Sequence, residues 1–261
     1  MTPERVLQHP PLVLDQRQRE RYFEDGFLTV PGYVGAAWLD RLRAVVAAKI
    51  EESRMLTASD DQFDLAPDHS AEKPNIRRLR KADGGDAVRW HQDIQAWPHT
   101  NFGVLTFGVY LDDTGPEQGP LTALPGTHRG TIFDQFDDAG RWTGAIVPRD
   151  VATLPTDTTT ELCGPAGTVV LIHCRVVHGS AANYSSRMRP LLLNVYSAAD
   201  ALPITPTPTP TSKTGVLVRG QEPTHVHMEP YPARLPPRWD QVGYRSVFAA
   251  QQAAASRPRG D

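Results

Sequence analysis

The chain has 261 residues, of which 39% are hydrophobic and 22% charged, and its formal net charge is −3. These values are ordinary for a globular protein, and the length suits one domain with a substantial core. Acidic and basic residues are interspersed, which argues against a nucleic-acid or anionic-membrane surface. No apolar run approaches the roughly 20 residues that cross a bilayer.

Features that bear on cellular location are few. The sequence begins without the basic and then apolar pattern of a signal peptide. Cys163 and Cys174 are its two cysteines, too few for a disulfide scaffold. We therefore expect a reduced, cytoplasmic protein. The sequence makes no prediction of the oligomeric state.

The N-terminal part shows helical patterns on either side of a short strand. A polar helix is predicted from Asp15 to Glu24, and Gly26 follows it as a stop signal. Residues 27–30 are predicted to form a strand. Apolar residues at helical spacing predict an amphipathic helix over 36–53: Trp38, Leu42, Val45, Val46 and Ile50. Residues 55–74 show no period and are predicted to form a loop.

Beyond residue 75 the helical signal gives way to short runs of β-formers between Gly, Pro and Asp clusters. Strands are predicted near residues 75–81, 88–95, 103–112, 120–124, 167–177 and 189–197. This pattern predicts a mainly β fold with flanking helices, either a β-sandwich or a jelly roll. We expect a single domain over 1–261, with a helical part at about 15–53, a β core at about 75–200 and a tail at 203–261.

The strongest chemical signal lies in Arg89-Trp90-His91-Gln92-Asp93. Residues i and i+2 of a strand point to the same face, so one strand can offer an imidazole and a carboxylate to one metal ion. The third ligand has to come from elsewhere, and His178, after the predicted strand 167–177, is placed to supply it. Two histidines and one carboxylate, with open coordination positions, are the facial triad that holds non-haem Fe(II) in oxygenases.

Arg189 follows His178 by eleven residues. A guanidinium can hold a carboxylate through two parallel hydrogen bonds, which makes Arg189 a candidate for a dicarboxylate co-substrate.

The other histidines have plainer interpretations. His225 and His227, with Glu229 two residues on, form a metal-binding pattern, but their Pro-rich surroundings favour a surface role. His173 would lie on the opposite face of a continuous strand from the third ligand, so a buried, hydrogen-bonded histidine is expected there. His99 is a loop residue that could face the substrate.

These stretches resemble the phytanoyl-CoA dioxygenase superfamily of Fe(II)/2-oxoglutarate oxygenases, and within it the bacterial hydroxylases of ectoine and proline. The likeness runs from about Asp15 to about Pro203. Three pieces carry it: Trp90–Asp93 with Trp97, Gly119–His128, and Gly164–Ser180 with Asn183 and Arg189. The lead-in between residue 75 and His91 is shorter than the family pattern.

The resemblance implies a mainly β fold of the cupin-like jelly-roll type (double-stranded β-helix). It also implies Fe(II), 2-oxoglutarate and O2 as cofactor and co-substrates. Three residues would hold the iron and carry the catalysis: His91, Asp93 and His178. Arg189 would pair with the distal carboxylate of 2-oxoglutarate, and Ser180 or Thr106 would add a hydrogen bond. The reaction implied is hydroxylation of an unactivated C–H bond of a small-molecule partner, such as an amino acid or a natural-product intermediate.

Other classes of protein stay open at this point. One is a non-catalytic metal- or ligand-binding β-sandwich. A zinc hydrolase is another, but it would need a general base near the metal and has no use for Arg189. Iron-dependent conversion of 2-oxoglutarate to succinate separates an oxygenase from both.

The substrate pocket is less well defined by the sequence. On a strand that continues past Asp93, Gln95 and Trp97 would share its face and line the pocket, although Trp97 could equally belong to the core. Three arginines are candidates either for a substrate carboxylate or for solvated strand positions: Arg77, Arg78 and Arg80. Alternation along a strand prevents all three from facing inward.

Two irregular segments flank the predicted core. Residues 130–163 are polar and lie between the two ligand stretches. The Pro-Thr tract, residues 203–211, favours extended polyproline geometry. Because it follows a predicted core strand, it is either a stiff flap over the site or an exposed connector.

Overall fold

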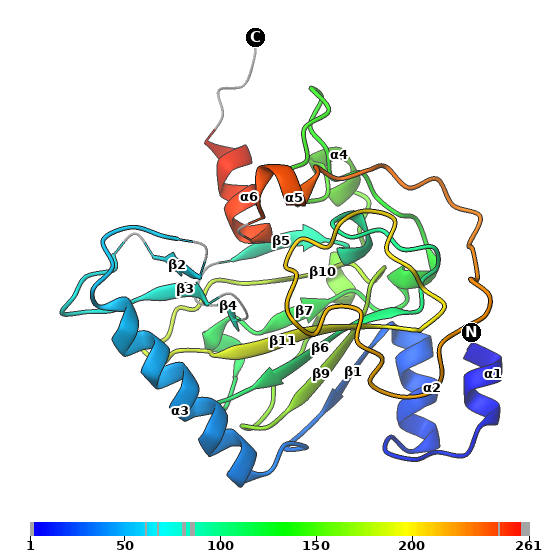
Figure 1. Cartoon of the computed structure of the whole chain (residues 1–261), viewed down its shortest axis with the longest axis horizontal. Helices are drawn as coiled ribbons and strands as arrows, with labels where there is room; N and C mark the ends of the chain where they lie inside the picture. The colour runs from blue at the N-terminus through cyan, green and yellow to red at the C-terminus, as the bar shows by residue number, and fades with distance from the viewer. Residues whose placement is uncertain are drawn as a thin grey trace.

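Two antiparallel sheets face each other in a jelly roll (Figure 1). The computed structural model describes residues 3–60, 62–66, 68–79, 82–83, 87–244 and 246–256. The seven-stranded sheet has the order β1-β9-β6-β11-β4-β3-β2, and the four-stranded sheet has the order β5-β10-β7-β8. The mainly β fold predicted from the sequence is the fold observed.

The strands are short, as the predicted pattern requires: β1 Phe27–Val30, β2 Phe63–Leu65, β3 Ile76–Leu79, β4 Ala82–Asp83, β5 Val88–His91, β6 Val104–Tyr110, β7 Leu121–Ala123, β8 Thr160–Glu161, β9 Val169–His173, β10 His178–Ser180 and β11 Leu191–Ser197. The α-helices are α1 Pro3–Gln8, α2 Gln16–Asp25, α3 Ala36–Ser53, α4 Pro148–Val151, α5 Trp239–Val242 and α6 Val247–Ala255. Within the described ranges no helix is long and apolar enough to cross a membrane.

Local sequence signals set the bounds of the first long helices. The Asp15 carboxylate accepts the N–H of Gln18 at 2.7 Å, and the Gln18 side chain accepts the N–H of Asp15 at 2.9 Å. This reciprocal capping box starts α2. Gly26 ends the helix in the left-handed conformation, with φ +84°, which a residue with a Cβ adopts only under strain. α3 spans 36–53, as predicted.

Two apolar layers lie on either side of the seven-stranded sheet. The inner layer fills the space between the sheets and consists of Phe27, Tyr110, Ala123, Leu162, Val170, Ile172, Val176 and Leu191. The outer layer joins the far face of the sheet to the N-terminal helices, and includes Leu28, Leu39, Val109, Leu111 and Val169. Figure 1 shows α2 and α3 on that outer face, where the amphipathic pattern of α3 predicts contact.

Three strand bounds differ from the predictions. The segment 55–74, predicted to be a loop, contains β2, which pairs with β3. The predicted strand 88–95 ends at His91, and a 3-10 helix covers Asp93–Gln95. The predicted strand 167–177 ends at His173, and after a turn β10 begins at His178 in the other sheet.

The C-terminal tail packs beside the four-stranded sheet, where Figure 1 shows α5 and α6. The Trp239 ring lies 5.0 Å from Trp142 and 4.9 Å from Tyr244, centroid to centroid. The Trp239 Nε1–H also donates to Ala96 O at 2.8 Å. These contacts anchor a segment for which the sequence predicted no structure.

The Pro-Thr tract leaves the seven-stranded sheet after β11. Its first residue, Pro203, forms a bridge with His99, and the N–H of Ile204 donates to Pro98 O at 2.9 Å. The beginning of the tract is therefore fixed against the segment that follows Asp93.

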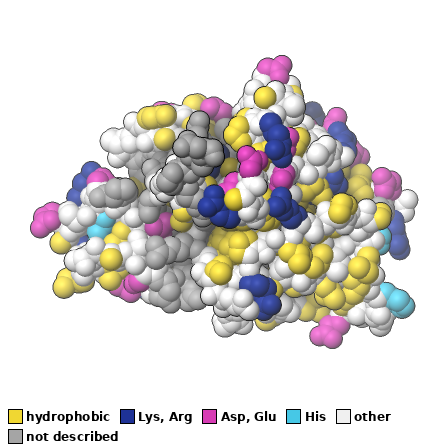
Figure 2. Space-filling model, turned by 90° about the horizontal axis from the view of Figure 1, so that it is seen from above, with side chains coloured by type: hydrophobic (Ala, Val, Ile, Leu, Met, Phe, Trp, Pro, Cys, Tyr) yellow, Lys and Arg dark blue, Asp and Glu magenta, His cyan; other side chains and the backbone are white. Residues whose placement is uncertain are grey.

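Charge on the surface is mixed, as the sequence predicts. On the face shown in Figure 2, basic and acidic side chains are interspersed with hydrophobic ones. Ion pairs on the surface include Arg234 with Asp134 at 3.1 Å and Arg141 with Asp137 at 2.8 Å. Exposed pairs of this kind contribute little to stability but keep a surface free of a single-sign field.

Candidate metal centre

The pairing of β5 with β10 brings two histidines together. His178 is directly opposite His91 in this antiparallel pair, so both imidazoles project from the same face. Their ring centroids are 4.1 Å apart. The pairing is irregular just beyond this point, and a Cβ on Gly179 would lie only 2.6 Å from Val88 O. Glycine after His178 therefore allows the two strands to approach closely.

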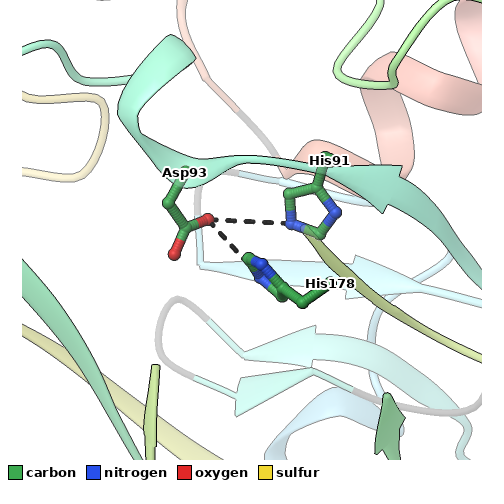
Figure 3. A group of neighbouring side chains, drawn as sticks. All are labelled: His91, Asp93 and His178. Atoms are coloured by element: carbon green, nitrogen blue, oxygen red, sulfur yellow. Dashed lines mark ion pairs between the residues drawn. The ribbon is translucent and has the colours of Figure 1, made fainter. Parts of the chain in front are cut away.

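Asp93 reaches the two histidines from the 3-10 helix that follows β5. Its Oδ1 lies 3.7 Å from the Nε2 of His91 and 3.7 Å from the Nε2 of His178 (Figure 3). One ligand atom from each residue lies within 4.8 Å of the others, and no other group of three such residues meets this condition in the described part of the chain. The prediction that these side chains converge is correct. The premise of a continuous strand is wrong, because the chain turns at Asp93.

Hydrogen bonds orient both imidazoles toward this point. The His91 Nδ1 lies 2.9 Å from Arg89 O, and the His178 Nδ1 lies 3.1 Å from Val176 O. A carbonyl oxygen only accepts, so each Nδ1 carries a proton, and each Nε2 is the ring nitrogen that faces Asp93 Oδ1. Burial, and secondly the neighbouring His178, lower the pKa of His91 well below its usual value. The His91 ring is therefore neutral near pH 7, the form that binds a metal.

Thr106 on β6 fixes the carboxylate. Its hydroxyl donates to Asp93 Oδ2 at 2.7 Å. Oδ1 is consequently the oxygen that faces the histidines. The resemblance implied that this hydroxyl or that of Ser180 would donate to the co-substrate, whereas in the structure the Thr106 hydroxyl donates to Asp93. Hydrogen bonds of this kind orient metal ligands.

Gln92 is a functional residue that the sequence analysis missed. Its side chain is fully buried, accepts the N–H of Phe133 at 2.8 Å, and donates to Arg175 O at 2.6 Å and Thr131 O at 3.1 Å. These bonds join the turn between His91 and Asp93 to two other loops. The sequence did contain a signal for Gln92, because it lies between two candidate metal ligands. An amide buried at such a position needs hydrogen-bond partners from other segments.

Arg189 and Arg187 differ in burial and in their partners. Arg187 is exposed and pairs with Glu117 at 2.9 Å. Arg189 is 4% exposed, lies two residues before the start of β11, and interacts with the Tyr110 hydroxyl. Burial raises the pKa of Tyr110 to about 12, with Arg189 acting in the opposite direction. Ser180, 7% exposed, lies on β10 opposite Leu121. A guanidinium buried within the sheets retains its charge and can recognise an anion there.

The predicted roles of Gln95 and Trp97 in a substrate pocket rested on a strand that the structure does not contain. Gln95 lies in the 3-10 helix, is buried, and donates from Nε2 to Phe133 O at 2.8 Å. Trp97 packs against two apolar clusters, which is the core alternative. Both side chains support the turn that carries Asp93. Of the three candidate arginines, Arg80 lies outside the described residues, as do the side chains of Arg77 and Arg78.

The remaining histidines lie away from this cluster of ligands. His227 pairs with Glu229 at 3.3 Å, and both side chains are well exposed. His99 is buried, with its Nδ1 2.7 Å from Trp97 O. His173 Nδ1 accepts the N–H of Arg175 at 3.1 Å, in agreement with the expectation of a hydrogen-bonded histidine.

His173 predicts a measurable acid sensitivity. Burial, with His128 and Arg175 adding to it, lowers the pKa of His173 to about 3, whereas an unfolded histidine titrates near pH 6.5. Between these values the unfolded state binds a proton that the folded state does not. The free energy of unfolding should therefore fall as the pH falls, by up to about 1.4 kcal/mol per pH unit for this group.

The variant His173→Asn retains an acceptor for the N–H of Arg175 but does not titrate. Its free energy of unfolding, measured in urea from about pH 6 to about pH 4, should depend less steeply on pH than that of the wild type. The difference in slope should correspond to nearly one proton fewer taken up on unfolding. The exposed His225→Asn is the matched control and should keep the wild-type slope. Equal slopes in all three proteins would show that His173 is not the buried neutral group described.

The fold and this cluster of side chains define a class: a jelly roll in which two histidines and one carboxylate could hold a single metal ion. The family model of phytanoyl-CoA dioxygenase matches residues 79–191, which include all three ligand candidates and Arg189. The chain belongs to the phytanoyl-CoA dioxygenase superfamily.

Curated relatives support this membership. A protein described as a probable alpha-ketoglutarate-dependent hypophosphite dioxygenase, from Stutzerimonas stutzeri, is 36% identical over 180 residues, covering 68% of this chain and 62% of the relative. The L-proline trans-4-hydroxylase of Streptomyces griseoviridis is 30% identical over 146 residues, covering 49% and 54%. The chain thus spans between half and two thirds of the length of these relatives.

Among solved structures, EctD from S. alaskensis with bound Fe has a TM-score of 0.59 at 19% identity, over 85% of this chain and 89% of that one. The same protein with 2-oxoglutarate and 5-hydroxyectoine also gives 0.59, at 20% identity and the same coverage. This similarity shows the jelly-roll fold.

Proposed function

We propose that the protein is an Fe(II)- and 2-oxoglutarate-dependent dioxygenase that hydroxylates an unactivated C–H bond of a small molecule. The convergence of His91, Asp93 and His178 carries the proposal, because both Nε2 atoms face one carboxylate oxygen. Membership of the phytanoyl-CoA dioxygenase superfamily supports the choice of iron and 2-oxoglutarate over zinc.

The donor set fits Fe(II). Two imidazoles and one carboxylate on one side of a metal leave positions open for a co-substrate and O2. Iron held there would supply the oxidative decarboxylation of 2-oxoglutarate to succinate and CO2 and the oxidant for the substrate. The chain contributes orientation: Thr106 holds Asp93 Oδ2, and two backbone carbonyls hold the imidazoles.

Arg189 is the proposed partner of the distal carboxylate of 2-oxoglutarate. It is buried close to the inner apolar layer, in contact with Tyr110. A dianion entering this region gains a charge-assisted, two-pronged partner in a place where water competes little. Ser180, buried on the neighbouring sheet, is the proposed second donor.

The proposed substrate site lies beside β11. Val195 is directly opposite Thr106 in the β6–β11 pair, so both side chains are on the same face. Thr106 contacts Asp93, yet Val195 is 50% exposed. The surface beside the carboxylate is therefore accessible. The relatives are described as acting on hypophosphite, proline and ectoine, and we propose a substrate of similar size, an amino acid or natural-product intermediate.

The test is succinate formation from 2-oxoglutarate under air with Fe(II), first alone and then with a panel of amino acids, small metabolites and hypophosphite. Iron-dependent succinate formation that one compound stimulates, with an oxygenated product, supports the proposal. A protein that binds Fe(II) and 2-oxoglutarate but makes no succinate with any compound would instead be a non-catalytic binding protein. Hydrolysis supported by zinc but not by iron would indicate a hydrolase.

A further inference from the structure

The strand that carries His91 lies at the edge of its sheet. β5 pairs with β10 on one side only, in the order β5-β10-β7-β8. An edge strand leaves backbone N–H and C=O groups without a neighbouring strand. At Arg89, two residues before His91, the C-terminal helix α6 supplies the partner, through a glutamine that is only 4% exposed, Gln251.

The Gln251 amide binds Arg89 as a paired strand would. Its Oε1 accepts the N–H of Arg89 at 2.8 Å, and its Nε2 lies 3.3 Å from Arg89 O. The same Nε2 donates to Gly144 O at 2.7 Å, and Arg89 Nη2 donates to Gln251 O at 3.1 Å. One side chain thus fixes both backbone groups of Arg89 across a separation of 162 residues.

The Arg89 carbonyl is also the acceptor that orients the first ligand. It accepts the Nδ1–H of His91 at 2.9 Å. We propose that Gln251 is a positioning residue for the metal centre: it holds the Arg89 peptide groups, and these in turn set the direction of the His91 ring. The proposal rests on the proposed function only in that a metal binds at His91, Asp93 and His178.

α6 is suited to this role because it is held independently of Gln251. The Ser246 hydroxyl accepts the N–H of Ala249 at 2.9 Å and caps the helix. Val247 packs in the aromatic cluster that contains Trp142 and Trp239. The helix is therefore a fixed support rather than a free end, and a group mounted on it can restrain the edge strand.

The test compares Gln251→Met with Gln252→Met. Methionine is close to glutamine in size but makes none of these hydrogen bonds, and Gln252 is the exposed neighbour on the same helix. Metal affinity is measured by titrating the protein with Co(II) alone and following its visible absorption. Loss of the groups that orient metal ligands typically weakens metal binding 10–100-fold. We expect Gln251→Met to bind Co(II) roughly tenfold more weakly than the wild type. Gln252→Met should bind Co(II) with wild-type affinity.

General destabilisation of α6 needs its own control. Val247→Ala removes apolar packing of the same helix but leaves the Gln251 amide in place. If Gln251→Met and Val247→Ala lower the melting temperature equally while only Gln251→Met weakens Co(II) binding, the positioning role is supported. The positioning role is overturned if Gln251→Met binds Co(II) with wild-type affinity. It is also overturned if Gln251→Met and Val247→Ala lose Co(II) affinity equally. Failure of the wild type itself to bind Co(II) would instead refute the proposed metal site.

Discussion

Replacing Asp93 or His178 by alanine should abolish Fe(II)-dependent succinate formation and leave the fold intact. Each substitution removes one of three groups that converge on a single point, and two remaining donors hold Fe(II) too weakly for turnover. Neither side chain belongs to the apolar layers that hold the sheets together. The far-ultraviolet circular dichroism spectrum and the urea midpoint should therefore stay close to those of the wild type.

The exposed His227→Ala is the matched control for His178→Ala, and it should retain full turnover. Co(II) titration of the same variants separates loss of the metal from loss of a later step. Wild-type turnover in Asp93→Ala or His178→Ala would remove that residue from the proposed set of ligands. An equal loss of turnover in His227→Ala would show that the exposed His225–Glu229 stretch also contributes to activity.

Arg189→Lys should raise the apparent KM for 2-oxoglutarate roughly tenfold or more. Lysine keeps the positive charge but lacks the planar fork that binds both oxygens of a carboxylate. Loss of about 1.5–3 kcal/mol of charged hydrogen bonding corresponds to at least this change in affinity. The measurement is succinate formation at a saturating concentration of iron, with 2-oxoglutarate varied.

Arg187→Lys provides the matched comparison, because Arg187 is exposed and paired with Glu117. Its KM for 2-oxoglutarate should be that of the wild type. If Arg187→Lys raises the KM and Arg189→Lys does not, the co-substrate is held outside the jelly roll rather than beside Tyr110. An unchanged KM in both variants would assign the distal carboxylate to another residue.

Features determined by neighbouring residues could be predicted from the sequence. The bounds of α2 depend on the Asp15–Gln18 capping box and on Gly26, and the bounds of α3 on its apolar period. The three candidate ligands were identified because their residue types and spacing limit the chemistry to few choices. None of these predictions required knowledge of which strands pair.

The predictions that failed depended on contacts between distant segments. β5 stops at His91 because the Gln92 side chain bonds to the loops at Thr131 and Arg175, and no local pattern reports these partners. The continuous strand on which the prediction for Gln95 rested is absent for the same reason. β2 is short and forms only by pairing with β3, so its own residues showed no period. The C-terminal helices depend on an aromatic cluster assembled from Trp142 and Trp239.

The hydrogen bond from Thr106 to Asp93 joins the two sheets at the ligands themselves. Thr106 belongs to β6 of the seven-stranded sheet, whereas Asp93 follows β5 of the four-stranded sheet. The position of the carboxylate therefore depends on the spacing of the sheets, which the inner apolar layer sets. Substitutions that empty this layer would change the spacing of the sheets and therefore the position of the Asp93 carboxylate relative to the two histidines. Packing between the sheets therefore helps to determine where the proposed metal ligands lie.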